Sequence, residues 1–343
     1  MDQLYSLEVV KKNQIEGYFK ERLGDISVLS GNPFVIDAAH KFNEAFEAAG
    51  GKVSGEQYNS VESEYGPWLS QYNNEYGYYD LFLIHSDGDI VYTVAKESDL
   101  GENLLTGPLR SSNLAECFQR AVGGKITFED FVPYAPSNGD PASFVCAPLR
   151  KEGRISGVVA LQIPLDAINK IMKERAGLGK TGETYLVGPD KLMRSDSYLD
   201  PTNHSVVASF RNPSQGSVDT EASREALAGQ SDKKIIIDYN GNPVLSAYSP
   251  MKIDNVTWAV IAEIDKAEAF AAVKALQWVI GIVAIIAIAA IVAVALLVTG
   301  SITKPINRII SSLGSGSEQV SSASEQLSSS SQQMSEGASE QAS

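Results

Sequence analysis

The sequence predicts an α+β protein: a long N-terminal helix, two tandem units with antiparallel sheets, one transmembrane helix and a coiled-coil helix. Three observations support this prediction. The N-terminus has a helical apolar stripe, the middle of the chain has two successive sets of strand and turn patterns, and an uncharged apolar segment follows them. A chain of 343 residues is long enough for about two domains.

The N-terminal helices are predicted from apolar spacing and from helix stop signals. Large apolar residues three or four apart over residues 4–30 indicate an amphipathic helix. Asn32-Pro33 ends this helix and starts a second one, which Gly50-Gly51 ends. A third helix is expected from about Glu56 to Asn74, with an interruption at Gly66-Pro67. Residues 1–76 therefore form an N-terminal helical region.

The first sheet unit is predicted over residues 77–164. The segment YYDLFLIHSDGDIVYTV contains two β-rich runs around Asp87-Gly88, which is typical of a hairpin. A short helix from Ser111 to Val122 follows. Three candidate strands come next, with the sequences ITFEDFVPY, ASFVCAPLR and RISGVVALQIP.

The same order of elements recurs over residues 165–272. After a linking helix (Leu165 to Arg175), GKTGETYLVGPDKLMRS predicts a second pair of strands around a Gly-Pro-Asp-Lys turn. A helix from Thr220 to Leu227 precedes a hairpin, KKIIIDYNGNPVLSAYSPM, which turns at Asn240-Gly241. The last strand is TWAVIAEID.

A transmembrane helix is predicted over residues 275–303, which contain no charged residue. Its inner part, Trp278 to Val298, is apolar throughout, and about 20 apolar residues cross a hydrocarbon core roughly 30 Å thick. Lys304 and Arg308 favour a cytoplasmic location for the C-terminal side. The N-terminus has no apolar segment, so we expect the chain to be part of a longer protein with a preceding span.

A seven-residue repeat after the membrane segment predicts a coiled coil within residues 304–343. Leu313, Val320, Leu327 and Met334 are each seven residues apart. The alternative is a flexible tail rich in serine, glycine and glutamine.

In this order, the elements resemble the double-Cache sensor domains of bacterial chemoreceptors. The resemblance covers roughly residues 1–270 and rests on YYDLFLIHSDGDIVYTVAKESDLGENL, GKTGETYLVGPDKLMRSDS and GNPVLSAYSPM with WAVIAEID. It implies two PAS-like Cache units, the membrane-distal one at 77–164 and the membrane-proximal one at 165–272. SITKPINRII, which follows the membrane segment, resembles the opening of a HAMP signal-relay helix.

This resemblance also implies a function. The chain is expected to be a homodimeric transmembrane chemoreceptor in the bacterial inner membrane, with its sensor outside the cytoplasm. It would bind a small ligand such as an amino acid, a carboxylate or a similar metabolite, and signal to a cytoplasmic adaptor and kinase. The alternative is a sensor histidine kinase or a nucleotide cyclase with the same outer domain.

The predicted ligand site combines aromatic rings with carboxylates. Aromatic residues are dense between positions 68 and 92, and Asp80 and Asp130 could pair with an ammonium group. The aromatic-arginine spacing of the amino-acid-binding subset is missing. The alternative is that these aromatic rings pack in the core. The candidate ligand-binding residues are Trp68, Tyr79, Asp80, Phe82, Tyr92 and Asp130.

Arg194 could bind a carboxylate, although a surface or intersheet ion pair with Asp196 or a neighbour is the expected state. Gln319, Gln326, Gln333 and Glu340 recur every seven residues. They resemble the methylation helix of chemotaxis receptors, and Gln333 and Glu340 are the methylation candidates. The alternative is a polar coiled-coil face.

Composition excludes several other functions. With 28 basic and 42 acidic residues, the net charge is −14, and no basic stripe is available for nucleic acid. No spacing of histidines, cysteines or carboxylates indicates a metal site, a cofactor or an enzyme active site, and GLGKTGE lacks the first glycine of a P-loop. Cys117 and Cys146 could form a disulfide, but separate apolar packing is the expected state.

Overall fold

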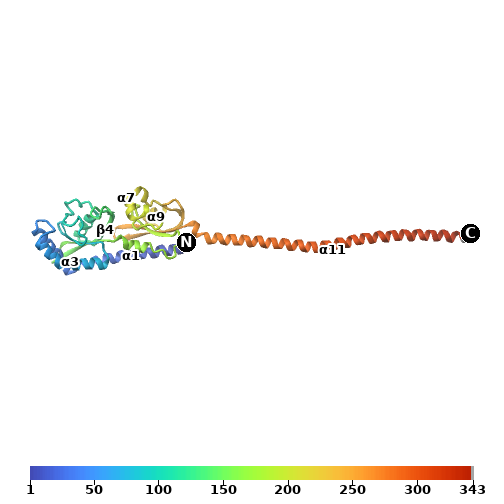
Figure 1. The fold of residues 1–343 in the computed structure, drawn as a ribbon, viewed down its shortest axis with the longest axis horizontal. Coiled ribbons are helices and arrows are strands. Elements are labelled where there is room, and N and C mark those ends of the chain that lie inside the picture. The colour runs from blue at the N-terminus through green and yellow to red at the C-terminus, as the bar shows by residue number, and fades with distance from the viewer. Residues whose placement is uncertain (341–343) are drawn as a thin grey trace. The chain divides into compact units, whose positions relative to one another are not determined.

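The computed structural model describes residues 1–340. They divide into a compact N-terminal unit, Met1–Phe270, and a C-terminal unit that begins at Ala271 (Figure 1). The N-terminal unit contains three N-terminal helices and two antiparallel sheets, and the C-terminal unit is one long apolar helix. The predicted fold class is confirmed.

The N-terminal helices are α1 (Asp2–Ser30), α2 (Pro33–Ala48) and α3 (Glu56–Tyr76). Asn32 ends α1 and caps α2, because its Oδ1 accepts a hydrogen bond from the backbone N of Phe34 at 3.0 Å. The predicted interruption at Gly66-Pro67 is wrong, since α3 continues through Pro67. Tyr65 and Leu69, on either side of this proline, are buried, so tertiary packing holds the helix together.

The first sheet has five antiparallel strands in the order β2-β1-β5-β4-β3. The hairpin that was predicted around Asp87-Gly88 consists of β1 and β2, and α4 (Asn113–Val122) precedes β3. The strands are β1 (Asp80–His85), β2 (Ile90–Thr93), β3 (Thr127–Pro133), β4 (Pro141–Lys151) and β5 (Arg154–Gln162).

The second sheet has four antiparallel strands in the order β6-β9-β8-β7. Its strands are β6 (Glu183–Val187), β7 (Asp232–Ile237), β8 (Pro243–Ile253) and β9 (Val256–Asp265). The predicted helices appear as α5 (Leu165–Met172) and α9 (Glu221–Leu227). Three short helices between them were not predicted: α6 (Pro201–His204), α7 (Val206–Arg211) and α8 (Pro213–Gly216).

The strand that was predicted to pair with β6 is absent, and only an isolated bridge joins Val187 to Met193. Two backbone hydrogen bonds remain at this edge, from Arg194 N to Leu186 O (2.8 Å) and from Gly188 N to Leu192 O (2.9 Å), and serine side chains supply further acceptors. The backbone N of Leu186 donates to Ser195 Oγ at 3.0 Å, and the backbone N of Met193 donates to Ser209 Oγ at 3.1 Å. The chain therefore leaves the sheet edge toward α6.

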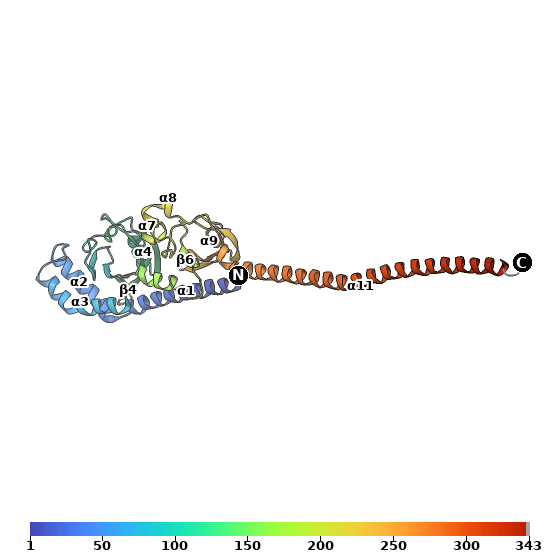
Figure 2. The same ribbon diagram turned by 45° about the vertical axis from the view of Figure 1, so that its right-hand side comes forward.

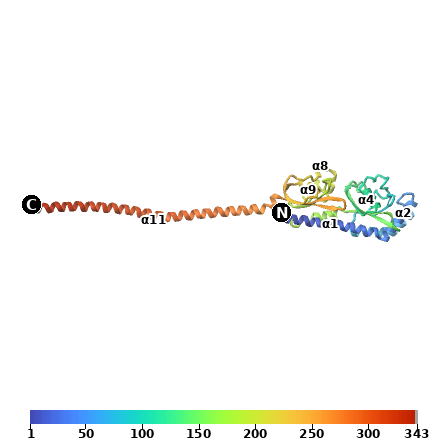
Figure 3. The ribbon, with the colours of Figure 1, turned by 180° about the vertical axis from the view of Figure 1, so that it is seen from behind.

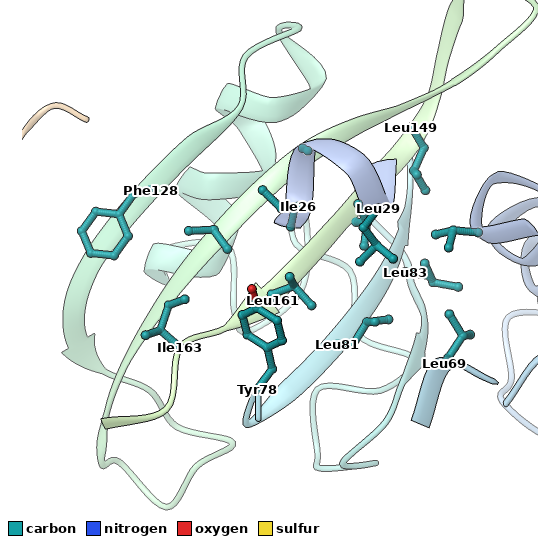
Figure 4. Close-up of a cluster of buried hydrophobic side chains, with 14 of the residues drawn as sticks. Ile26, Leu29, Leu69, Tyr78, Leu81, Leu83, Phe128, Leu149, Leu161 and Ile163 are labelled. Atoms are coloured by element: carbon teal, nitrogen blue, oxygen red, sulfur yellow. The ribbon is translucent and has the colours of Figure 1, made fainter. Parts of the chain in front are cut away.

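One helix packs against both sheets. Figures 2 and 3 show α1 running along the side of the two sheets, where it contacts β4, β5, β8 and β9. Ile26 and Leu29 of α1 lie near Leu81 and Leu161 of the first sheet in Figure 4, and Phe19 contacts Trp258 of the second sheet with ring centroids 5.3 Å apart. The opposite faces of the sheets are covered by α4 and α9.

The C-terminal unit is the helix α11 (Ala271–Glu340), which follows the short helix α10 (Lys266–Ala269) in the chain. Its most apolar 18-residue stretch has a mean hydropathy of 3.2, and it is the one helix among the described residues that is long and apolar enough to cross a membrane. It continues through Pro305 into the seven-residue repeat. Gln333 is exposed, whereas the side chain of Glu340 lies outside the described part of the chain.

Candidate functional site

The aromatic residues that were predicted to line the ligand site lie in different parts of the N-terminal unit. Trp68 of α3 stacks with Tyr72 at 5.7 Å, and both rings line a hollow of about 380 Å³ against the end of α1. Phe82 and Tyr92 are buried on opposite faces of the first sheet, where Phe82 contacts Phe144 on the α4 side and Tyr92 contacts Phe42 of α2. The structure does not bring Trp68, Phe82 and Tyr92 together around one ligand.

Asp80 is the first residue of β1 and is fully buried. Because side chains alternate along a strand, it shares the α4 face with Phe82. Its Oδ1 accepts hydrogen bonds from the backbone N of Leu81 (2.7 Å), Val94 (2.8 Å) and Ala95 (2.9 Å). Among residues 1–340, its Oδ2 has no hydrogen-bond partner. Burial is the main cause that raises the pKa of Asp80 to about 7.

Two more carboxylates follow β2. Asp99 is close enough to Asp80 to add to its raised pKa, and burial raises the pKa of Asp99 itself to about 6. The Tyr134 hydroxyl donates to Asp99 Oδ2 at 2.8 Å, and the Tyr79 hydroxyl donates to Glu97 Oε1 at 2.6 Å. Tyr79, half exposed, is thus the one predicted aromatic that contacts a carboxylate of this group.

Gln162 of β5 completes the group, because it lies directly opposite Asp80 in the sheet register. It is 4% exposed, and its Nε2 donates to Ser137 Oγ at 3.3 Å. Ser137 Oγ in turn donates to Glu97 Oε2 at 3.1 Å. Gln162 Oε1, like one oxygen of Asp80 and one of Asp99, has no partner within the described chain. We call the three carboxylates of Asp80, Glu97 and Asp99, together with the amide of Gln162, the first-sheet carboxylate cluster.

The first-sheet carboxylate cluster has no balancing cation. No lysine, arginine or histidine among residues 1–340 forms an ion pair with Asp80, Glu97 or Asp99. A buried carboxylate without a cation is costly, so the cluster is suited to an ammonium group, which supplies positive charge and several N–H donors. Sequence reasoning missed Glu97, Asp99 and Gln162. A usable signal was the acidic pair in KESDLGEN directly after a strand.

Asp130 lies outside this cluster and joins the two sheets. Arg194, 2% exposed by its side chain, donates to both Asp130 oxygens, at 2.8 and 2.9 Å, and to Asp190. The Trp258 indole N–H also donates to Asp130, at 3.1 Å. A surface or intersheet ion pair of Arg194 with Asp196 or a neighbour was predicted, and Arg194 does pair with Asp190, four residues away, whereas Asp196 pairs with Lys173. The buried partner comes from β3, far away in the sequence.

Cys117 of α4 and Cys146 of β4 form a disulfide, with their Cα atoms 5.8 Å apart. The expectation that these cysteines pack separately is therefore wrong. The helix packs directly on the strand, which places both side chains in the same buried cluster. Disulfides persist in oxidising compartments, so this bond favours a location outside the cytoplasm.

Among residues 1–340, no three histidine, cysteine or carboxylate side chains lie close enough together to hold a metal ion.

Comparison with known proteins agrees with this architecture. A family model described as Cache domain matches residues 2–273. The sensor domain of the V. cholerae histidine kinase DctB superposes with a TM-score of 0.51 at 14% identity, covering 75% of this chain and 94% of that one. The ligand-binding domain of the Pseudomonas aeruginosa PAO1 amino acid chemoreceptor PctC, in complex with GABA, gives 0.50 at 14% identity, with coverage of 77% and 99%. At these identities the structural likeness is evidence for the fold.

Proposed function

The chain belongs to the Cache domain family, and we propose that it is the sensor, membrane and early relay part of a bacterial chemoreceptor. Its ligand is a small molecule with an ammonium group, bound outside the cytoplasm at the first-sheet carboxylate cluster. The observation that supports this assignment is the pair of buried carboxylates, Asp80 and Asp99, each with one unpartnered oxygen and no balancing cation within residues 1–340. Of the predicted residues, Asp80 binds the ammonium group and Tyr79 lies at the entrance.

The other predicted residues have supporting roles in this proposal. Phe82 packs behind Asp80 on the same face of β1. Trp68 and Tyr92 belong to the α2–α3 side of the first sheet, and Asp130 links the sheets through Arg194. These four residues shape the sensor without contacting the ammonium group. The ligand then changes the equilibrium between two arrangements of the sensor, to which α1 and α11 respond.

Exposed apolar residues support a homodimer. Val10 and Val28 of α1 are 50% and 78% exposed, and the four apolar residues of the seven-residue repeat in α11 are each at least 68% exposed. A strict apolar repeat on an exposed helix needs a partner helix to cover it. A second copy of the chain supplies this partner, and the resulting bundle presents Gln333 and Glu340 for methylation and leads to the adaptor and kinase.

The ligand assignment is tested with residues 1–270 in the oxidised state. We expect GABA or another primary amine of a metabolite panel to raise the melting temperature and to give saturable heat in calorimetry. Asp80→Asn should lower this affinity at least tenfold, because the amide removes the charge but keeps the shape. Asp140→Asn, which changes an exposed carboxylate in the loop between β3 and β4, is the matched control. Failure of all amines, or equal affinity of Asp80→Asn and the unmodified protein, would rule out the assignment.

The receptor type has its own test, because a sensor histidine kinase or a nucleotide cyclase is the alternative and DctB has the same fold. Membranes containing the full-length receptor are incubated with a chemotaxis methyltransferase and labelled S-adenosylmethionine. Methyl esters that disappear in Glu340→Ala, or in Gln333→Ala when a deamidase has first hydrolysed the Gln333 amide to a glutamate, support a chemoreceptor. Autophosphorylation on histidine, without methylation, would support the kinase.

A further inference from the structure

The second sheet has a carboxylate pair of its own. Glu183 is the first residue of β6, and Glu263 of β9 lies directly opposite it in the register. Their side chains are therefore neighbours on one face of the sheet. Both residues are at most 3% exposed.

The two carboxylates differ in how they are bonded. Glu183 Oε2 accepts hydrogen bonds from Ser197 Oγ (2.8 Å) and from the backbone N of Tyr198 (2.9 Å) and Leu199 (3.2 Å). Glu183 Oε1 accepts from the Tyr239 hydroxyl. Glu263 has one donor, the Tyr185 hydroxyl, at 2.8 Å, and its second oxygen has no partner within residues 1–340.

A second buried polar atom without a partner lies beside this pair. Ser246 of β8 is fully buried and is opposite Glu263 in the register, so its side chain is on the same face. Its Oγ makes no hydrogen bond of normal length in the described chain, but the hydroxyl lies close enough to Glu263 to lower the pKa of that carboxyl group, against the effect of burial. A ligand N–H could use both the free oxygen of Glu263 and this hydroxyl.

The surroundings of the pair are negative. In the described part of the chain, no lysine, arginine or histidine forms an ion pair with Glu183 or Glu263. The one histidine nearby is His204, whose ring lies 4.2 Å from that of Tyr239 and whose Nδ1 is bonded to Asp200. Burial, with Glu183 and Asp238 adding to it, raises the pKa of Glu263 to about 8.

An open groove has Tyr239, a hydrogen-bond partner of Glu183, in its wall. A hollow of about 410 Å³ is lined by Tyr239, and the hydroxyl of the same tyrosine is bonded to Glu183 behind it. The groove is also lined by three carboxylates, those of Asp219, Glu221 and Asp238, and by one guanidinium, Arg224. Asp219 forms ion pairs with Lys191 and Arg224, and Glu221 forms one with Lys234, so Asp238 is the lining carboxylate without an ion pair in the described chain. Tyr239 is the residue that separates the groove from the buried carboxylates.

The position of the pair matches that of the first-sheet carboxylate cluster. Asp80 and Glu183 each begin the first strand of their sheet, and each faces a residue of the last strand, Gln162 and Glu263 respectively. Each also accepts two backbone N–H groups from a later segment, Val94 and Ala95 in one case and Tyr198 and Leu199 in the other. The two sheets thus repeat one arrangement of buried acceptors.

From these observations we infer that the second sheet contains a separate binding site for a compact primary ammonium ion, formed by Glu263, Ser246 and Glu183. Tyr239 closes this site, and a bound ammonium ion replaces its hydrogen bond to Glu183. The site does not depend on Asp80, so the sensor has two amine sites of related chemistry. This second site includes Glu263 of β9, the strand that α10 and α11 follow directly in the chain.

The test uses the full chain in nanodiscs, with methylammonium chloride and butane-1,4-diammonium chloride as probes and sodium chloride at equal ionic strength as the reference. Calorimetry on Asp80→Asn isolates the second site, where we expect saturable binding. Adding Glu263→Gln, which keeps the shape of a carboxyl group, should lower that affinity at least tenfold. Adding Tyr239→Phe instead should raise it about three- to tenfold, since the closing hydrogen bond is lost. Near-UV circular dichroism checks that each variant is folded.

Three results would overturn the inference. The first is the absence of saturable binding in Asp80→Asn, and the second is an unchanged affinity after Glu263→Gln in a folded protein. The third is that Glu263→Gln lowers the affinity for tetramethylammonium, which has no N–H donor, as much as it lowers the affinity for methylammonium. The proposed ligand site at the first-sheet carboxylate cluster has a separate test. It is ruled out if Glu263→Gln, with Asp80 unchanged, abolishes all amine binding.

Discussion

Asp80 and Glu263 illustrate how burial changes a single carboxylate. Both lie at sheet positions where alternation turns them inward, and both have an oxygen without a hydrogen-bond donor in the described chain. Water stabilises a charged carboxylate better than a dry sheet face does, so the pKa values rise to about 7 and about 8. Each residue is therefore near its titration point at neutral pH, where an arriving cation has the largest effect on its charge.

Asp80 should make the stability of the sensor depend on pH. A carboxyl group whose pKa is raised by folding contributes stability that is complete below its unfolded value, near 4, and lost as the pH rises through about 7. In Asp80→Asn, the loss of unfolding free energy between pH 5 and pH 8 should be smaller by about 2–3 kcal/mol. Urea titrations of residues 1–270 at each pH measure this difference.

Asp140→Asn is the control for this titration, because Asp140 forms an exposed ion pair with Arg211 that contributes less than about 1 kcal/mol. Parallel pH curves for the unmodified protein and Asp80→Asn would show that Asp80 is ionised throughout and would contradict the raised pKa.

At the scale of elements, one ion pair joins β3 of the first sheet to the segment after β6. The Arg194 guanidinium fills the space beside Gly188, where an added Cβ would lie 2.2 Å from Arg194 Cζ. A glycine is therefore needed at position 188 for close packing. Asp254, in the β8–β9 turn, adds a second link, because it accepts from Arg120 and from the backbone N of Phe128.

Arg194→Ala should destabilise the sensor strongly. It leaves Asp130 largely buried without its cation, which costs about 3–5 kcal/mol. Arg211→Ala also removes an arginine that pairs with an aspartate of the loop between β3 and β4, but that pair is exposed and should contribute less than about 1 kcal/mol. Chemical denaturation of residues 1–270 compares the two variants. Equal costs would mean that the buried pair does not hold the sheets together.

At the scale of the whole molecule, α11 connects an extracytoplasmic sensor to a relay segment in the proposed receptor. Its apolar part has the length of one membrane crossing, and the disulfide in the first sheet suits an oxidising compartment. Since both native cysteines are in this disulfide, the oxidised protein has no free thiol among its residues. Introduced cysteines can therefore report topology without interference.

Ser311→Cys, beyond the apolar part of α11, should react with a membrane-impermeant maleimide only after the cells are permeabilised. Ser231 is exposed just before β7, and Ser231→Cys should react in cells whose outer membrane is permeabilised while the inner membrane is intact. Gel shift of the labelled protein gives the readout. Labelling of Ser311→Cys in intact cells would reverse the proposed orientation.

The elements with strong local signals were predictable from the sequence. The apolar stripe of α1, the turn at Asp87-Gly88 and the charge-free segment of α11 depend on periodicity and turn chemistry, which neighbouring residues determine. Errors occurred where tertiary contacts outweigh local preference. Pro67 stays within α3 because both its flanks are buried, and the edge after β6 bonds to serine hydroxyls in place of a strand.

The sequence by itself determined the order of the sheets and the membrane segment, because each leaves a pattern within a short window. Only the tertiary structure decided which residues meet: Asp80 with Asp99 and Gln162, Glu183 with Glu263, Asp130 with Arg194, and Cys117 with Cys146. These pairs arise from strand register and from packing between distant segments. A buried carboxylate needs its cation or its proton only once the fold has removed water, and no local pattern records that removal.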